Sequence, residues 1–124
     1  MGYYSDVGIK CRKKAFEMFR EAWNEHNIHP DVVLIDKERN EYLIAWSCVK
    51  WYDEFEDVSA ITEVMDRLDN MSDANIEAKD GYGYAFTRIG EESDDIDSRT
   101  NNYEVELWVR RELDIDPEWK ELRA

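Results

Sequence analysis

Apolar residues recur along this chain with two different periods, and together these periods predict a mixed α+β fold. Spacings of three and four residues predict two amphipathic helices, one over residues 12–26 and one from Asp57 or Ser59 to Met71. Alternating or continuous apolar runs predict five strands, over residues 3–11, 31–35, 42–51, 81–89 and 103–110. The polar stretches predict a turn at 36–41, loops at 72–80 and 90–102, and an added helical turn in the tail at 114–124.

The order of these elements is β-α-β-β-α-β-β, and its first six members match a split βαβ, ferredoxin-like domain. We therefore expect strand order 4-1-3-2, both helices on one face of the sheet, and an added C-terminal strand beside the fourth. The strand at 42–51 is apolar on both faces, which is typical of the centre of a sheet. Trp46 on this strand is expected to be buried beneath a helix.

Length and composition bound the class of protein. A chain of 124 residues with 43% hydrophobic residues predicts a single α+β domain, residues 1–124, with its own core. No apolar run is long enough to span a membrane, and the first residues lack the pattern of a secretory signal, so the expected location is the cytoplasm. Cys11 and Cys48 both lie in apolar runs. We expect two buried, reduced thiols, too far apart in the predicted sheet for a disulfide.

Charge is distributed unevenly along the chain. The net charge is −14, and residues 53–97 alone hold fifteen acidic and three basic residues. Such a field opposes direct binding to nucleic acid or anionic membranes and favours a basic partner protein. The alternative is that the charge serves solubility alone.

The acidic residues concentrate in the second predicted helix, its lead-in and the loop at 90–102. Along the helix they recur opposite the apolar stripe, with only Arg67 to relieve them. These positions form the candidate partner-binding surface: Asp53, Glu54, Glu56, Glu63, Asp66, Asp73, Glu91, Glu92, Asp94, Asp95 and Asp97.

An alternative candidate site lies near the N-terminus. Lys10, Arg12 and Lys13 form a small basic cluster in the same segment as Tyr3 and Tyr4. An aromatic pocket lined by tyrosine and tryptophan beside this cluster would bind and sequester a small molecule or nucleotide.

Other chemistry is poorly supported, and we expect no catalytic residue, metal ligand or cofactor. His26 and His29 have too few companions for a metal site. A calcium loop beginning at Asp95 fails, because Arg99 stands at a ligand position and Thr100 replaces the required glycine. Neither a Gly-rich phosphate loop nor a nucleophile motif is present.

The last predicted strand exposes Trp108 between charged residues, which predicts that a second copy of the chain or a partner covers it. A homodimer is therefore one expected assembly.

Three segments resemble a group of small acidic proteins encoded by bacteriophages and prophages. These segments are the opening Met-Gly-Tyr-Tyr-Ser-Asp-Val, the block Trp-Ser-Cys-Val-Lys-Trp-Tyr at 46–52, and the block Arg-Ile-Gly-Glu-Glu-Ser-Asp-Asp-Ile-Asp at 88–97. The resemblance implies a phage accessory protein in the cytoplasm of a bacterial host and transfers no residue role. With the charge pattern, it predicts a protein that modulates or inhibits a host defence or nucleic-acid-handling protein by occupying a basic site.

Overall fold

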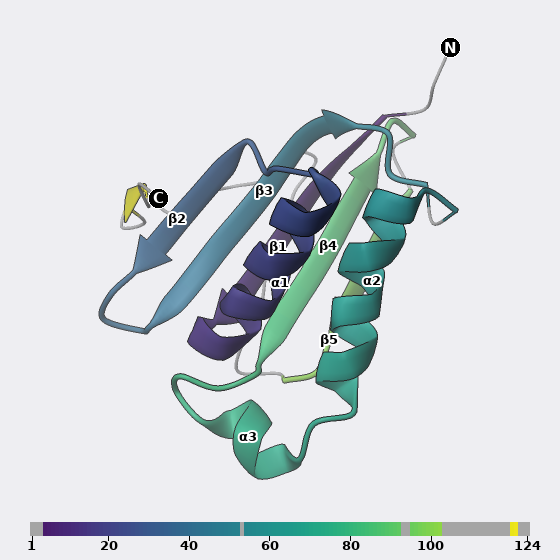
Figure 1. Ribbon diagram of the computed structural model, residues 1–124. Helices are drawn as coiled ribbons and strands as arrows, with labels where there is room; N and C mark the ends of the chain where they lie inside the picture. Colours follow the sequence, from purple (N-terminus) through teal and green to yellow (C-terminus); the bar gives the residue numbers. More distant parts are fainter. Residues whose placement is uncertain (1–3, 53, 93–94, 103–119, 122–124) are drawn as a thin grey trace.

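The computed structural model describes residues 4–52, 54–92, 95–102 and 120–121. The elements follow one another in the order β1 (Ser5–Arg12), α1 (Lys13–His26), β2 (Val32–Asp36), β3 (Glu41–Val49), α2 (Glu56–Asp69), α3 (Asp73–Glu77), β4 (Tyr84–Gly90), β5 (Ile96–Thr100) and β6 (Lys120–Glu121) (Figure 1).

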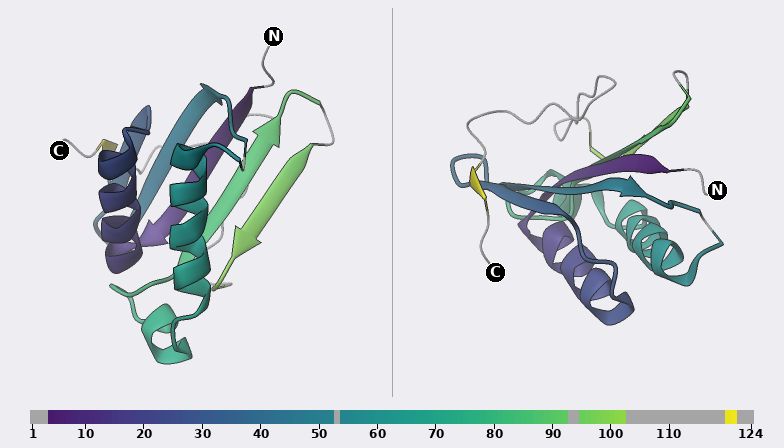
Figure 2. Two further views of the ribbon diagram at one scale, coloured as in Figure 1. Left: turned by 45° about the vertical axis from the view of Figure 1, so that its right-hand side comes forward. Right: turned by 90° about the horizontal axis from the view of Figure 1, so that it is seen from above.

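The described strands form one antiparallel sheet in the order β5-β4-β1-β3-β2-β6, so the predicted α+β class is confirmed. Within this sheet the first four strands stand in the order 4-1-3-2. Helices α1 and α2 lie side by side on the same face (Figure 2). Helix α2 is therefore placed over the part of the sheet that contains β4, with β5 at the edge beside it (Figure 2).

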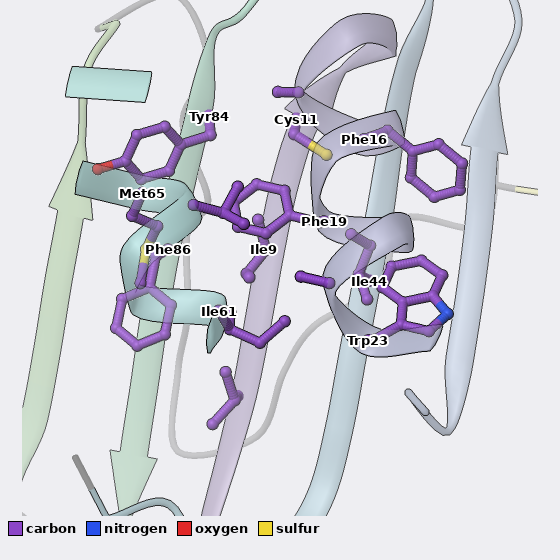
Figure 3. Packing of buried hydrophobic residues seen from close by; sticks show 14 of the residues in the cluster. Ile9, Cys11, Phe16, Phe19, Trp23, Ile44, Ile61, Met65, Tyr84 and Phe86 are labelled. Atoms are coloured by element: carbon purple, nitrogen blue, oxygen red, sulfur yellow. The ribbon is translucent and has the colours of Figure 1, made fainter. Parts of the chain in front are cut away.

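The core fills the space between the two helices and the sheet (Figure 3). Helix α1 forms because its apolar residues recur on one stripe, and it ends where Asn27 adopts a left-handed conformation with φ 58°. Helix α2 buries a stripe of the same kind. The buried residues of the two helices are Ala15, Phe16, Phe19, Ala22, Trp23, Val58, Ile61, Val64, Met65 and Leu68.

Trp46 is buried in this core against α1, as predicted. Its side chain is 1% exposed, and its indole N–H donates a hydrogen bond to the carbonyl oxygen of Ile28 at 3.1 Å. The ring of Trp23 from α1 packs edge-on against it, with the ring centres 6.5 Å apart. On the opposite face of β3, Leu43 and Ala45 are also buried, so the strand is covered on both faces.

The prediction of an unbroken loop at 90–102 is wrong, because Ile96–Thr100 forms β5 and pairs with β4. Four of the five residues of β5 are polar, so apolar alternation gives no signal there. Backbone pairing with β4 and ion pairs from arginine side chains hold the strand instead.

The predicted loop at 72–80 contains a short helix, α3, which buries Ile76. The chain then returns so closely to α3 that a Cβ atom at position 81 would lie 2.0 Å from the carbonyl oxygen of Asn75, which explains the glycine there.

The prediction of a helical turn in the tail is wrong at Lys120–Glu121, because these two residues form β6 and pair with β2. The strand predicted at 103–110, with Trp108, lies outside the described residues, so the homodimer stays a prediction.

The two cysteines lie in different environments. Cys11 is fully buried, whereas Cys48 is exposed, so the prediction of two buried thiols is wrong for Cys48. Cys48 adopts a positive φ of 54° near the end of β3, past the buried part of the strand. Cys11 lies opposite Tyr42 in the sheet, and Cys48 follows Tyr42 by six residues on β3. The two cysteine positions are therefore about 20 Å apart along the strand.

Replacing Trp46 with alanine should lower the free energy of unfolding by about 3–5 kcal/mol, because the surrounding rings cannot close so large a cavity. Urea unfolding of the wild type and of Trp46→Ala measures the difference. Phe55→Ala is the comparison variant, since the Phe55 side chain is 40% exposed, and it should cost much less. Equal losses in the two variants would contradict the central position of Trp46.

The thiols should react at very different rates with a thiol reagent at mildly alkaline pH. Burial, and to a smaller extent the charge of Glu41, raises the pKa of the Cys11 thiol well above its usual value. Since the thiolate is the reactive form, Cys48 should react in the folded protein and Cys11 only after unfolding. Counting modified thiols with and without urea tests this, and Cys48→Ser should show no reaction in the folded state. Fast modification of Cys48→Ser would contradict the buried position of Cys11.

Candidate functional site

A pocket of about 470 Å³ opens between α2 and the β4–β5 side of the sheet. Its volume lies in the range typical of ligand sites. The lining combines aromatic, apolar and charged side chains, namely Trp51, Tyr52, Glu54, Thr62, Met65, Phe86, Arg88, Asp95, Asp97 and Arg99.

The floor of the pocket is apolar and belongs to the core. Trp51 and Phe86 are each 8% exposed, and their ring centres lie 6.2 Å apart. The ring of Trp46 packs behind Trp51 at 5.3 Å. Figure 3 shows Met65 of α2 and Phe86 of β4 in the space between helix and sheet. Core packing thus holds the floor in place.

Arg88 of β4 organises the β4–β5 hairpin. Its guanidinium donates two parallel hydrogen bonds to the Asp95 carboxylate, at 2.6 and 3.1 Å. It also donates to Asp97, its cross-strand partner in the sheet, at 2.6 and 3.1 Å. These hydrogen bonds, to Asp95 above all, raise the pKa of Arg88 above its usual value. The Arg88 guanidinium is therefore charged at every physiological pH.

Arg99 of β5 reaches across to α2 and joins helix to hairpin. Its guanidinium donates hydrogen bonds to Asp66 at 2.6 Å and to Asp69 at 2.5 and 3.1 Å. Burial lowers the pKa of Arg99, but the hydrogen bonds to the two aspartates outweigh burial and leave that pKa above its usual value. Asp69 also accepts a hydrogen bond at 2.8 Å from the hydroxyl of Tyr84. Tyr84 is fully buried.

The electrostatic balance at the pocket favours cations. Arg88 and Arg99 each face two aspartates, so each cluster retains one excess negative charge. Glu54 adds an exposed carboxylate to the lining. A cation that enters the pocket therefore meets an excess of carboxylates, whereas an anion is repelled.

The structure gathers part of the predicted acidic surface at this pocket. Glu54 from the lead-in to α2 lines it together with Asp95 and Asp97 from the hairpin. Asp66 lies in the Arg99 cluster, at the join between α2 and β5. The remaining described members are exposed but do not line the pocket, and they are Glu56, Glu63, Asp73, Glu91 and Glu92. Asp53 and Asp94 lie outside the described residues.

The structure disperses the alternative basic site. Lys10 forms an ion pair with Glu41 at 3.7 Å, and Arg12 donates hydrogen bonds to two backbone carbonyls at the end of α3. Lys13 is exposed, and Tyr4 is 37% exposed. None of the four lines the pocket, and Tyr3 lies outside the described residues.

Sequence reasoning missed the two arginines as organisers of the site. The expectation that only Arg67 relieves the acidic helix is wrong, because Arg99 pairs with Asp66 and Asp69 from 30 or more residues away. A signal for Arg88 was present in the sequence. Its position opposite Asp97 becomes apparent once the segment 88–97 is aligned as a hairpin with a turn in its middle.

Within the described ranges, no group of three or more histidine, cysteine, aspartate or glutamate side chains is arranged to hold a metal ion. No helix of the described chain is both long and apolar enough to cross a membrane. No protein-family model, curated protein or solved structure matches this chain. An assignment of function therefore rests on the chain's own residues.

Tyr84→Phe should weaken the dependence of stability on alkaline pH. Burial first, then the hydrogen bond to Asp69, raises the pKa of Tyr84 above its ordinary value of 10.0. The folded state therefore holds the phenolic proton more tightly than the unfolded chain. This stabilisation is complete below pH ~10 and is lost as the pH rises further, towards the folded-state pKa. Urea unfolding at pH ~8 and ~11 should show a smaller loss of stability in Tyr84→Phe than in the wild type. Identical losses would refute the shift.

Proposed function

We propose that this protein is a non-enzymatic binding module that attaches to a basic surface of a partner protein through an acidic face around the pocket. This acidic face consists of the pocket carboxylates and of exposed glutamates on α2 and the hairpin: Glu54, Asp95, Asp97, Glu56, Glu63, Glu91 and Glu92. One observation carries the proposal. Carboxylates from the lead-in to α2 and from the β4–β5 hairpin, far apart in sequence, meet at one aromatic pocket and outnumber the arginines there.

The wider surface supports the same partner. Glu56 and Glu63 are exposed on α2, and Glu91 and Glu92 are exposed at the end of the hairpin. Exposed charges of one sign steer a partner of opposite charge and raise the rate of association. The net charge is −14, and residues 53–97 carry most of it, so this part of the chain strengthens the attraction.

A second candidate function is the sequestration of a small molecule or nucleotide. The size and aromatic lining of the pocket favour it. The charge balance opposes an anionic ligand, because both arginines of the lining already face two aspartates each. Lys10 and Arg12 do not line the pocket either. A basic protein surface is the better match.

The biological setting that we propose follows from the resemblance to phage proteins. In that setting the chain acts in the cytoplasm of a bacterial host. The fold that we propose is ferredoxin-like with added strands. Its target is a host defence or nucleic-acid-handling protein, because such proteins carry basic surfaces that bind phosphate backbones. The module would inhibit or modulate its target by occupying that surface.

Reversing charge on α2 should abolish partner binding without unfolding the domain. Glu56→Lys with Glu63→Lys changes two exposed residues. The matched control is Glu17→Lys with Glu21→Lys, which makes the same change in net charge on the exposed side of α1. Host proteins captured by the wild type and the control, but not by the α2 variant, would be the specific partners.

The association rate of such a partner should fall steeply with salt, because exposed charges are screened beyond about 8–10 Å at physiological ionic strength. A partner that binds the α2 variant and the wild type equally, with no dependence on salt, would overturn the proposed function.

A further inference from the structure

We infer that the pocket between α2 and the β4–β5 hairpin receives an arginine side chain of the basic partner. The inference rests on the proposed function and specifies its central contact. Three features carry it: an aromatic floor, carboxylate oxygens with unused acceptor capacity, and the balance of charge.

The floor offers aromatic surface to a cation. Trp51 and Phe86 form it, and Tyr52 is a half-buried member of the lining. A cation within about 6 Å of such a ring is attracted by the negative face of the π system, most strongly for tryptophan. Because core packing holds Trp51 and Phe86 in place, little side-chain freedom is lost when a ligand binds.

The rim offers hydrogen-bond acceptors. Asp97 is 66% exposed and uses one carboxylate oxygen, Oδ2, to pair with Arg88. Within the described residues, no hydrogen bond or ion pair engages its other oxygen or the carboxylate of Glu54. An ionised carboxylate accepts about four hydrogen bonds, so both groups can take further donors.

Arginine fits these features better than lysine does. Its planar guanidinium stacks on aromatic rings while its edge donates paired hydrogen bonds to carboxylates. It is also more weakly hydrated than an ammonium group, so it loses less on entering a partly apolar pocket. Arg88 and Arg99 do not repel it strongly, since each is outnumbered by its own aspartates. Buried arginine anchors of this kind often dominate the energy of protein interfaces.

In the test, the full chain is titrated with a capped single residue, N-acetyl-arginine-N-methylamide, and two-dimensional NMR monitors the binding. Binding should be in the millimolar range, and the largest shifts should fall on the indole N–H of Trp51 and on the amides of Thr62, Phe86 and Asp97. The citrulline analogue has the same shape without the charge. It should bind at least about fivefold more weakly, because it loses a cation–π contact and an exposed ion pair together. The lysine analogue should fall between the two.

Two glutamate variants supply a matched pair. Glu54→Gln removes a carboxylate from the lining, and Glu21→Gln removes an exposed carboxylate of α1 that does not line the pocket. Glu54→Gln should weaken binding of the arginine probe about threefold or more, the scale of one exposed ion pair, while Glu21→Gln changes it less than twofold. Both variants should keep the wild-type spectrum elsewhere.

The outcomes separate this inference from the proposed function. If the arginine probe causes no shifts at the pocket, or if citrulline binds equally well, the arginine anchor is overturned. If α2 charge reversal still abolishes partner binding in that case, the acidic-face function stands. Adenosine monophosphate is the anionic probe. Its binding at the pocket in preference to the arginine probe would overturn the anchor and support the sequestering function instead.

Discussion

Burial of one apolar layer between two helices and one face of the sheet is the interaction on which the rest of this structure depends. The layer joins β1, β3 and β4 to the apolar stripes of α1 and α2, with Trp46 near its middle. Because this packing sets the position of α2 over the sheet, it also sets which acidic residues can approach the β4–β5 hairpin. The charged site is thus located by apolar contacts that carry no charge themselves.

Arginine pairing then makes an acid-rich segment compatible with a folded sheet. Carboxylates crowded on one side of a domain repel one another and destabilise it. Arg88 pairs with two aspartates of its own hairpin, and Arg99 pairs with two aspartates of α2. The first cluster holds β5 to β4, and the second holds the hairpin to the helix. Two cations therefore offset part of the repulsion and also hold the edge of the sheet in place.

The carboxylates that these pairs leave uncompensated make up the proposed binding surface. Each arginine is outnumbered two to one, and Glu54 stands at the pocket without a described internal partner. The pocket joins this excess negative charge to the aromatic edge of the core. A surface of this composition suits a partner whose cations are weakly hydrated and planar, and it disfavours phosphate-bearing ligands.

The sequence by itself determined the α+β class, the two helices, the central place of the strand that carries Trp46, and the stretch in which negative charge accumulates. These features depend on hydrophobic periodicity and on local composition, and both can be read from a continuous stretch of sequence without knowledge of the fold. The tertiary structure alone decided that polar Ile96–Thr100 is a strand, that Cys48 is exposed, and that Arg99 reaches Asp66 and Asp69. It also decided that Trp51, Phe86 and Glu54 meet at one pocket. The physical reason is that pairing between polar groups follows distance in space. That distance is set only when the apolar layer has brought remote segments together.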